Sequence, residues 1–159
     1  MGGGLPAFGP ASIAGAVAGV LIAIGSCLTW LKMDDGDASK SYKGLDGDGV
    51  FTLIAGIVVI VLFALAVAMR KAPLAIAAGV PGIIALGLGI WNIAASERLP
   101  MKEEDIPGEG KEMVVKSIEE YGSTGIGLYL LLAGAVLAVG VAVFILVTAN
   151  RNHPRPYGR

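Results

Sequence analysis

The chain has 159 residues, of which 55% are hydrophobic and 16% are charged. Soluble domains have about a quarter of their residues charged, so the composition argues against a soluble globular protein. The formal net charge of −1, the single histidine and the single cysteine argue against a basic nucleic-acid-binding surface and a metal site of histidines and cysteines. We therefore expect no enzymatic activity, no cofactor and no nucleic-acid partner.

Four segments contain no charged residue, and we predict that each is a transmembrane helix. They are residues 11–31, 49–69, 73–95 and 125–149. At about 1.5 Å per residue, each is long enough to cross a hydrocarbon core of about 30 Å. Apolar residues lie on all sides of these segments, as in helices surrounded by lipid. The predicted fold is an all-α integral membrane protein, a four-transmembrane-helix bundle that forms one domain over residues 1–159.

The charged residues are sorted between the predicted loops, and this predicts the topology. Residues 32–48 contain three Lys and five Asp, and residues 96–123 contain four basic and eight acidic residues. Residues 70–72 and the tail, residues 150–159, have only basic charges. Because basic residues of short loops stay on the cytoplasmic side, we expect both termini in the cytoplasm and the two acidic loops outside the plasma membrane.

The first predicted span ends near a sequence that resembles a bacterial lipobox, Ile24-Gly25-Ser26-Cys27. The ten residues before this span contain no Lys or Arg, although a signal peptide has a positively charged start. Cys27 is therefore either a lipidation site or a small thiol packed within a helix, and both alternatives stay open.

Two carboxylates directly precede the second span, in Asp46-Gly47-Asp48-Gly49. A calcium loop that began at Asp46 would need a third polar ligand at its fifth position, but Val50 stands there. A carboxylate at the start of a helix can instead accept free backbone N–H groups. We expect Asp46 and Asp48 to form the structural entry of the second span, and they are only weak candidates for a metal site.

The two halves of the chain resemble each other, which predicts two tandem helical hairpins. Residues 49–70 align without gaps with residues 127–148, and this alignment pairs Phe51 with Tyr129. It also pairs Ala55-Gly56 with Ala133-Gly134. Small residues allow close helix contacts in lipid, either within one bundle or between copies. The glycines that we expect at such contacts are Gly15, Gly19, Gly82 and Gly134.

Aromatic residues and one proline mark further positions in the spans. Trp30, Trp91 and Tyr129 fall near the predicted outer ends, where aromatic rings commonly anchor a protein at the membrane interface. Pro81 lies inside the third span and should kink it, because proline removes one backbone donor. The kink is either a hinge or a feature that the neighbouring helices simply tolerate.

The second acidic loop contains a segment with helical periodicity. Val114, Ile118 and Tyr121 recur at helical spacing within residues 109–122, which predicts a short extracellular amphipathic helix. Its apolar face either binds a protein partner or packs on the ends of the helices. The loop charges of −2 and −4 sum to −6, so a partner at this outer acidic face should be basic.

Two motifs resemble those of small four-helix membrane proteins that are common in actinobacteria. They are "GLDGDGVFTL" at residues 44–53, which follows Trp30 and a polar loop, and "GIGLYLLLAG" at residues 125–134. The resemblance implies four spans and a plasma-membrane location. It implies no established activity and therefore no functional residues.

We expect a non-catalytic membrane protein that acts through protein–protein interaction, as a subunit, scaffold or envelope component. No predicted span contains an ionisable residue, which argues against proton-coupled transport. The alternative is an oligomeric pore or permeation subunit. An enzyme would need the acidic residues of the two outer loops to converge. Besides the lipid bilayer, the expected partner is a protein at the outer acidic face or a second copy of the chain.

Overall fold

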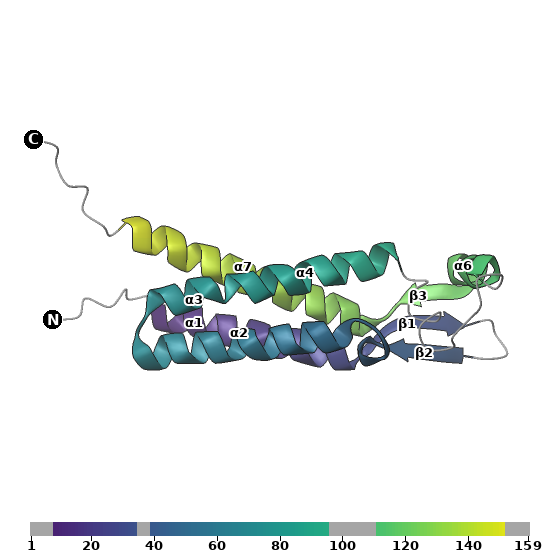
Figure 1. Ribbon diagram of the computed structural model, residues 1–159, viewed down its shortest axis with the longest axis horizontal. Helices are drawn as coiled ribbons and strands as arrows, with labels where there is room; N and C mark the ends of the chain where they lie inside the picture. Colours follow the sequence, from purple (N-terminus) through teal and green to yellow (C-terminus); the bar gives the residue numbers. More distant parts are fainter. Residues whose placement is uncertain (1–7, 35–38, 96–110, 152–159) are drawn as a thin grey trace, which may run out of the picture.

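The computed structural model describes residues 8–34, 39–95 and 111–151. It is a long helical bundle with a small sheet and a short helix at one end (Figure 1). The long helices are α1 (Phe8–Cys27), α2 (Gly49–Met69) and α7 (Ile126–Arg151), and a fourth consists of α3 (Ala72–Ala77) followed by α4 (Gly79–Ala94). All four are long and apolar enough to cross a membrane, which confirms the prediction of four such helices.

The prediction of an all-α fold is wrong, because the described residues also form a three-stranded antiparallel sheet. It consists of β1 (Thr29–Asp34), β2 (Ser39–Lys43) and β3 (Gly122–Thr124), in the order β2-β1-β3. The predicted first span therefore extends too far, since α1 ends at Cys27. Beyond it, Leu31 and Met33 point to one face of the sheet while Lys32 and Asp34 are exposed, which is the two-residue period of a strand.

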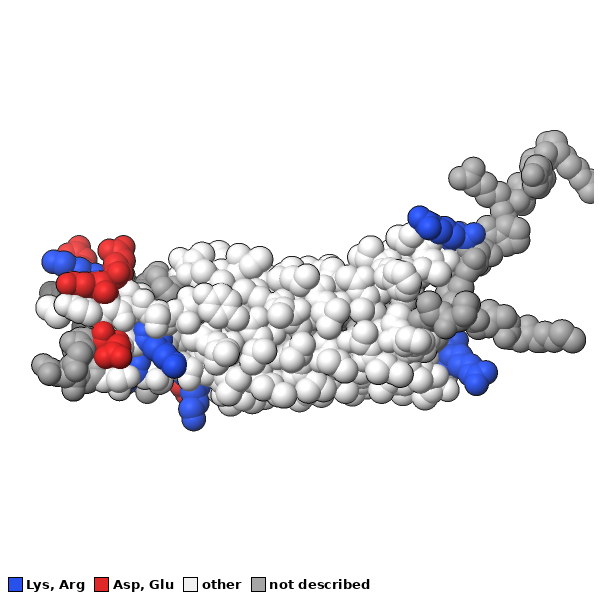
Figure 2. Space-filling view, turned by 180° about the vertical axis from the view of Figure 1, so that it is seen from behind, with Lys and Arg blue, Asp and Glu red and all other residues white. Residues whose placement is uncertain are grey.

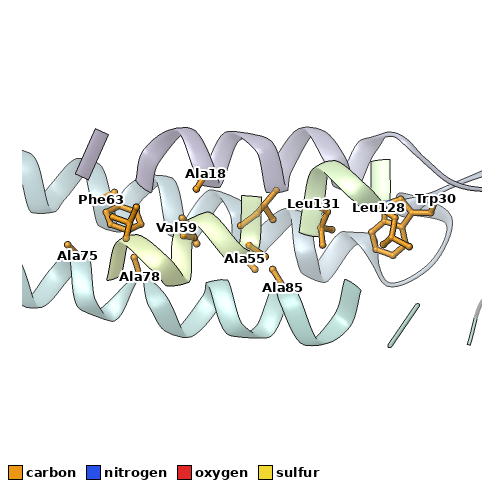
Figure 3. Packing of buried hydrophobic residues seen from close by; sticks show 14 of the residues in the cluster. Ala18, Trp30, Ala55, Val59, Phe63, Ala75, Ala78, Ala85, Leu128 and Leu131 are labelled. Atoms are coloured by element: carbon orange, nitrogen blue, oxygen red, sulfur yellow. The ribbon is translucent and has the colours of Figure 1, made fainter. Parts of the chain in front are cut away.

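The four long helices pack around a core of small and apolar side chains. Both α1 and α4 contact α2 and α7. Figure 3 shows alanine side chains of α3 and α4 facing larger side chains of the other helices, including Phe63, Val59 and Leu131. Phe63 and Leu131 are fully buried. The sequence therefore places small residues where helices approach and larger ones where space remains.

The predicted packing glycines lie at helix contacts within the chain. Gly15 lies against the ring of Phe63, and a Cβ atom at Gly19 would lie 2.9 Å from the Gly56 carbonyl oxygen. On α4, a Cβ atom at Gly82 would lie 3.2 Å from Val139 Cγ2.

The aligned glycines of the proposed repeat make similar contacts with α1. A Cβ atom at Gly56 of α2 would lie 2.9 Å from the backbone nitrogen of Ala23. A Cβ atom at Gly134 of α7 would lie 2.9 Å from the backbone nitrogen of Ile22. The two helices that the alignment pairs therefore flank the same helix through equivalent residues.

The third long helix is interrupted at Ala78, between α3 and α4. Pro81 has no N–H group for the carbonyl of Ala77, four residues earlier, and α3 ends at this residue. The next amide, that of Gly82, reaches the Ala78 carbonyl at 3.4 Å. We expected Pro81 to kink the helix. In the structure its missing donor coincides with a break between α3 and α4 about one turn before the proline.

Candidate interaction surface

One end of the bundle carries the sheet, the 3-10 turn η1 (Gly44–Asp46) and α6 (Lys111–Tyr121), and we call these elements the head. Each strand of the sheet lies beside a long helix in the sequence: β1 follows α1, β2 leads through η1 into α2, and β3 leads into α7. The head is therefore a direct extension of three helices. Figure 1 shows it at the opposite end from the start of α1 and the end of α7.

Trp30 joins the head to the bundle. Its side chain is 1% exposed, and its indole Nε1–H donates a hydrogen bond of 2.9 Å to the carbonyl of Gly25. Its own carbonyl accepts the N–H of Gly125, which precedes α7, at 2.8 Å. The ring of Trp30 is thus buried between the end of α1, η1 and the start of α7 rather than lying on the surface (Figure 3), and its predicted role as an interface anchor stays a prediction.

The other two aromatic residues that we predicted as anchors are on the surface. Trp91 is 58% exposed near the end of α4, and Tyr129 is 59% exposed near the start of α7. Both lie toward the head end of their helices, so their role as interface anchors stays a prediction.

The acidic turn before α2 closes over Trp30. Gly44 lies against the Trp30 indole, and its backbone contacts that of Gly49. Within the turn, the Asp46 carboxylate accepts the backbone N–H of Lys43 at 2.7 Å. Side chains at Gly44 and Gly49 would collide with these neighbours, which explains why glycines surround the two acidic residues.

Asp48 occupies the N-cap position of α2, but its carboxylate makes no capping hydrogen bond there. Its backbone carbonyl accepts the N–H groups of Phe51 and Thr52 instead. In the described part of the chain, no three His, Cys, Asp or Glu side chains lie close enough together to hold a metal ion. Asp35 and Asp37 lie outside the described residues.

The two faces of the sheet differ in polarity. On one face, Leu31 and Tyr42 are buried opposite each other in neighbouring strands. On the other face, Lys32 lies opposite Ser41 on β2 and Ser123 on β3, and all three are exposed. The first face is thus part of the core, whereas the second presents hydroxyl and ammonium groups.

The apolar face of α6 is turned toward the core and is not fully free for a partner. Ile118 is partly buried and packs on the hydrophobic core, as does Met33 of β1. Tyr121 is 43% exposed, and its hydroxyl donates a hydrogen bond to the Glu120 carboxylate. The side chain of Val114 lies outside the described residues. Of the two alternatives for this face, packing within the chain therefore applies to Ile118.

The opposite face of α6 is exposed and mainly acidic. Helical spacing puts five exposed residues on this face: Glu112, Met113, Lys116, Glu119 and Glu120. Met113 is 76% exposed, the highest value among the exposed large hydrophobic side chains. The same periodicity that predicts the apolar face also defines this one, and the partner-binding role that we expected for Val114, Ile118 and Tyr121 stays a prediction.

In the described part of the chain, charged side chains are confined to the two ends of the molecule. Figure 2 shows charges at the head, a broad band without charges along the bundle, and only basic side chains at the other end. The described basic residues there are Arg70, Lys71 and Arg151. Cys27 is exposed and lies where α1 meets the head.

No family model, curated protein or solved structure matches the chain. The resemblance to small actinobacterial membrane proteins therefore stays an expectation, and any function must be argued from the surfaces described above.

Proposed function

We propose that the chain is a multi-pass protein of the bacterial plasma membrane that acts without catalysis, by binding a basic protein partner through its head. In this proposal the protein is a subunit, scaffold or envelope component. The apolar band between two charged ends supports a membrane location, because a lipid core tolerates few charges. The buried polar side chains of the described bundle are Ser12, Ser26, Thr52 and Asn92, and none of them is ionisable.

The observation that carries the proposal is the exposed face of α6. It combines the carboxylates of Glu112, Glu119 and Glu120 with the thioether of Met113, and only Lys116 opposes their charge. Interfaces commonly combine an apolar anchor with a polar, charged rim, and Met is enriched at such surfaces because its side chain adapts to different partners. A partner with basic side chains would pair with these carboxylates while it covers the Met113 side chain.

The alternative of a pore has less support. A pore through one copy would follow the bundle axis, which Phe63, Val59 and Leu131 fill (Figure 3). A pore between copies would be lined by the outer faces of the helices, and these present mainly Ile, Val and Leu side chains. Among the described residues, neither surface presents the rings of carbonyl or charged groups that line ion-conducting pores.

Neutralising the exposed acidic face of α6 should weaken partner binding by about tenfold. Each exposed charge pair contributes up to about 1 kcal/mol, and about 1.4 kcal/mol corresponds to a factor of ten. The variant is Glu112→Gln/Glu119→Gln/Glu120→Gln, because Gln preserves length and helix propensity. Proteins that co-purify with the tagged chain in mild detergent are quantified by mass spectrometry, and the strongest partner is then titrated against both forms.

The matched control is Asp34→Asn/Asp48→Asn, which removes carboxylates elsewhere at the same end and should leave binding nearly unchanged. Binding should also weaken when salt is raised from about 0.05 to 0.5 M, because exposed charges are screened. Full binding by the triple variant, combined with loss of binding when residues 152–159 are deleted, would show that the partner recognises the basic end instead.

The head should face the outside of the cell, and the end with Arg70, Lys71 and Arg151 should face the cytoplasm. Basic groups near helix ends are retained on the cytoplasmic side. In a Cys27→Ser background, a cysteine at the exposed residue Ser41 should react with an impermeant maleimide on intact cells. A cysteine at the exposed residue Asn150 should react only after permeabilisation. Labelling in the reverse order would invert the proposed topology.

A further inference from the structure

The helix α4 is attached to the molecule differently from α1, α2 and α7. Those three helices connect to β1, β2 with η1, and β3, and the sheet pairs these strands with one another. The sheet therefore ties three helix ends together. The helix α4 ends at Ala94, and the described part of the chain places no strand in its direct continuation through Ala95; residues 96–110 lie outside it.

The contact between α4 and α7 involves side chains, whereas the contact between α1 and α7 involves backbone atoms. Cβ atoms added to Gly25 and Gly134 would meet backbone atoms of the facing helix, at 2.6 and 2.7 Å. On α4, Cβ atoms added to Gly79, Gly82 and Gly89 would meet side-chain atoms as their nearest neighbours, at 3.0, 3.2 and 2.7 Å. The backbones of α1 and α7 are thus in direct contact, whereas side chains separate α4 from α7. Of these neighbours, Val139 and Leu132 can change rotamer when α4 shifts, whereas the Ala142 Cβ atom against Gly79 and the backbone atoms against Gly25 and Gly134 cannot.

Buried hydrogen bonds near the head also distinguish α4 from α1 and α2. The hydroxyl groups of Ser26 on α1 and Thr52 on α2 lie 2.8 Å apart and form a buried hydrogen bond between the two helices. The buried Asn92 near the end of α4 donates to the Leu88 carbonyl of its own helix, also at 2.8 Å. The Asn92 donor would keep this bond if α4 moved as a unit, whereas the Ser26–Thr52 bond holds its two helices at one separation.

The interruption at Ala78 supplies a point about which α4 can turn. Ala78 keeps a right-handed helical conformation, but Pro81 lacks the amide that would bond to the Ala77 carbonyl, so one backbone hydrogen bond of the helix is missing there. Proline interruptions are among the few causes of sharp helix bends. The short helix α3 before the interruption contacts α1 as well as α2 and α7, whereas the main contacts of α4 are with α2 and α7. We therefore assign α3 to the fixed part of the bundle.

We infer that residues 81–94 of α4 form an arm that pivots about the Ala78–Pro81 interruption, against a rigid unit of α1, α2, α7 and the head. The arm is about 20 Å long at about 1.5 Å per residue. A swing of about 15°, smaller than the bends of more than about 20° at proline, moves its tip by about 5 Å. Such a movement separates the head-side end of α4 from α2 and α7 and opens the bundle laterally. The inference does not depend on the proposed partner.

Distances between pairs of spin labels in a Cys27→Ser background test this inference. The protein is reconstituted at one copy per nanodisc, and distances are measured by double electron–electron resonance. The first pair, Ile54 with Ile90, reports on the arm and α2. The second pair, Ile54 with Ala133, reports on α2 and α7 inside the rigid unit. All three positions are exposed on the outer surface of the bundle, so the labels should not disturb the core.

A third pair, Val80 with Val143, lies near the pivot, and both residues are exposed. We expect the Ile54–Ile90 distribution to be about twice as wide as the other two, or to show a second distance about 5 Å longer. Pro81→Ala should restore the helix and narrow this distribution toward the width of the other pairs.

Equal widths for Ile54–Ile90 and Ile54–Ala133 would overturn the inference, because α4 would then be as fixed as the other helices. An equally broad Val80–Val143 distribution would overturn it as well, since the movement would not begin at the interruption. A broad Ile54–Ile90 distribution that Pro81→Ala leaves unchanged would exclude Pro81 as the cause.

Discussion

Trp30→Ala is expected to lower the free energy of unfolding by about 3–5 kcal/mol, the range for truncating a fully buried large aromatic side chain. The side chain is 1% exposed. It lies against Gly44 and the end of α1, with Leu128 of α7 beside it (Figure 3). Its removal would leave a cavity where three helices meet the sheet. The measurement is an equilibrium unfolding titration with sodium dodecyl sulfate in mild detergent, followed by circular dichroism.

Two further substitutions separate the contributions of the Trp30 ring and of its hydrogen bond. Trp30→Phe keeps most of the volume but loses the bond to the Gly25 carbonyl, which should cost about 1–2 kcal/mol. Trp91→Ala removes an indole that is 58% exposed, and its effect should stay near 0.5 kcal/mol, about the limit for surface changes. Equal losses for Trp30→Ala and Trp91→Ala would refute the role of Trp30 as the link between head and bundle.

The helices were predictable because their signal is collective. Each span contains about twenty uncharged residues, so an error at one position hardly changes the prediction. The second span, residues 49–69, agrees with α2 at both ends. The first was extended to residue 31 because Trp30 and Leu31 are apolar, although they belong to β1. Composition alone cannot distinguish an apolar residue in lipid from one buried in a small sheet.

The sheet was not predictable with the same certainty, because its strands are short and their partners lie far apart in the sequence. The alternation of Leu31 and Met33 with Lys32 and Asp34 was visible, but four residues also fit a loop. The strand β3 has three residues, too few for any periodicity. Pairing of β1 with β3 depends on α1 and α7 lying side by side, and a tertiary contact of this kind leaves no local signal.

The candidate surface shows a different limit of sequence reasoning. Helical spacing correctly grouped Ile118 with the apolar side of α6. It could not show that the sheet covers this side, because the sheet itself was not predicted. Once β1 is present, Met33 and Ile118 share one core, and the carboxylates of Glu112 and Glu119 are left on the free side. The packing of Ile118 on the core therefore could not be predicted without the sheet.

Gly134→Ala in α7 is expected to destabilise the protein by about 1–3 kcal/mol, the usual cost of inserting a methyl group into a packed contact. The new Cβ atom would lie 2.7 Å from the Ala18 carbonyl oxygen and 2.9 Å from the Ile22 nitrogen. These are backbone atoms of α1, so they cannot rotate away, and the two helices must separate. Gly134→Leu should exceed this range and prevent α1 and α7 from packing.

The matched control is Gly140→Ala in the same helix, because nothing lies within 4 Å of a Cβ atom at Gly140. Alanine is favoured over glycine in helices by about 1 kcal/mol, so this variant should be unchanged or more stable. Gly56→Ala in α2 tests the aligned position of the proposed repeat and should resemble Gly134→Ala, since it meets the Ala23 nitrogen at 2.9 Å. The same detergent titration measures all four variants. If Gly134→Ala and Gly140→Ala were equally stable, close backbone contact between α1 and α7 would not hold the bundle together.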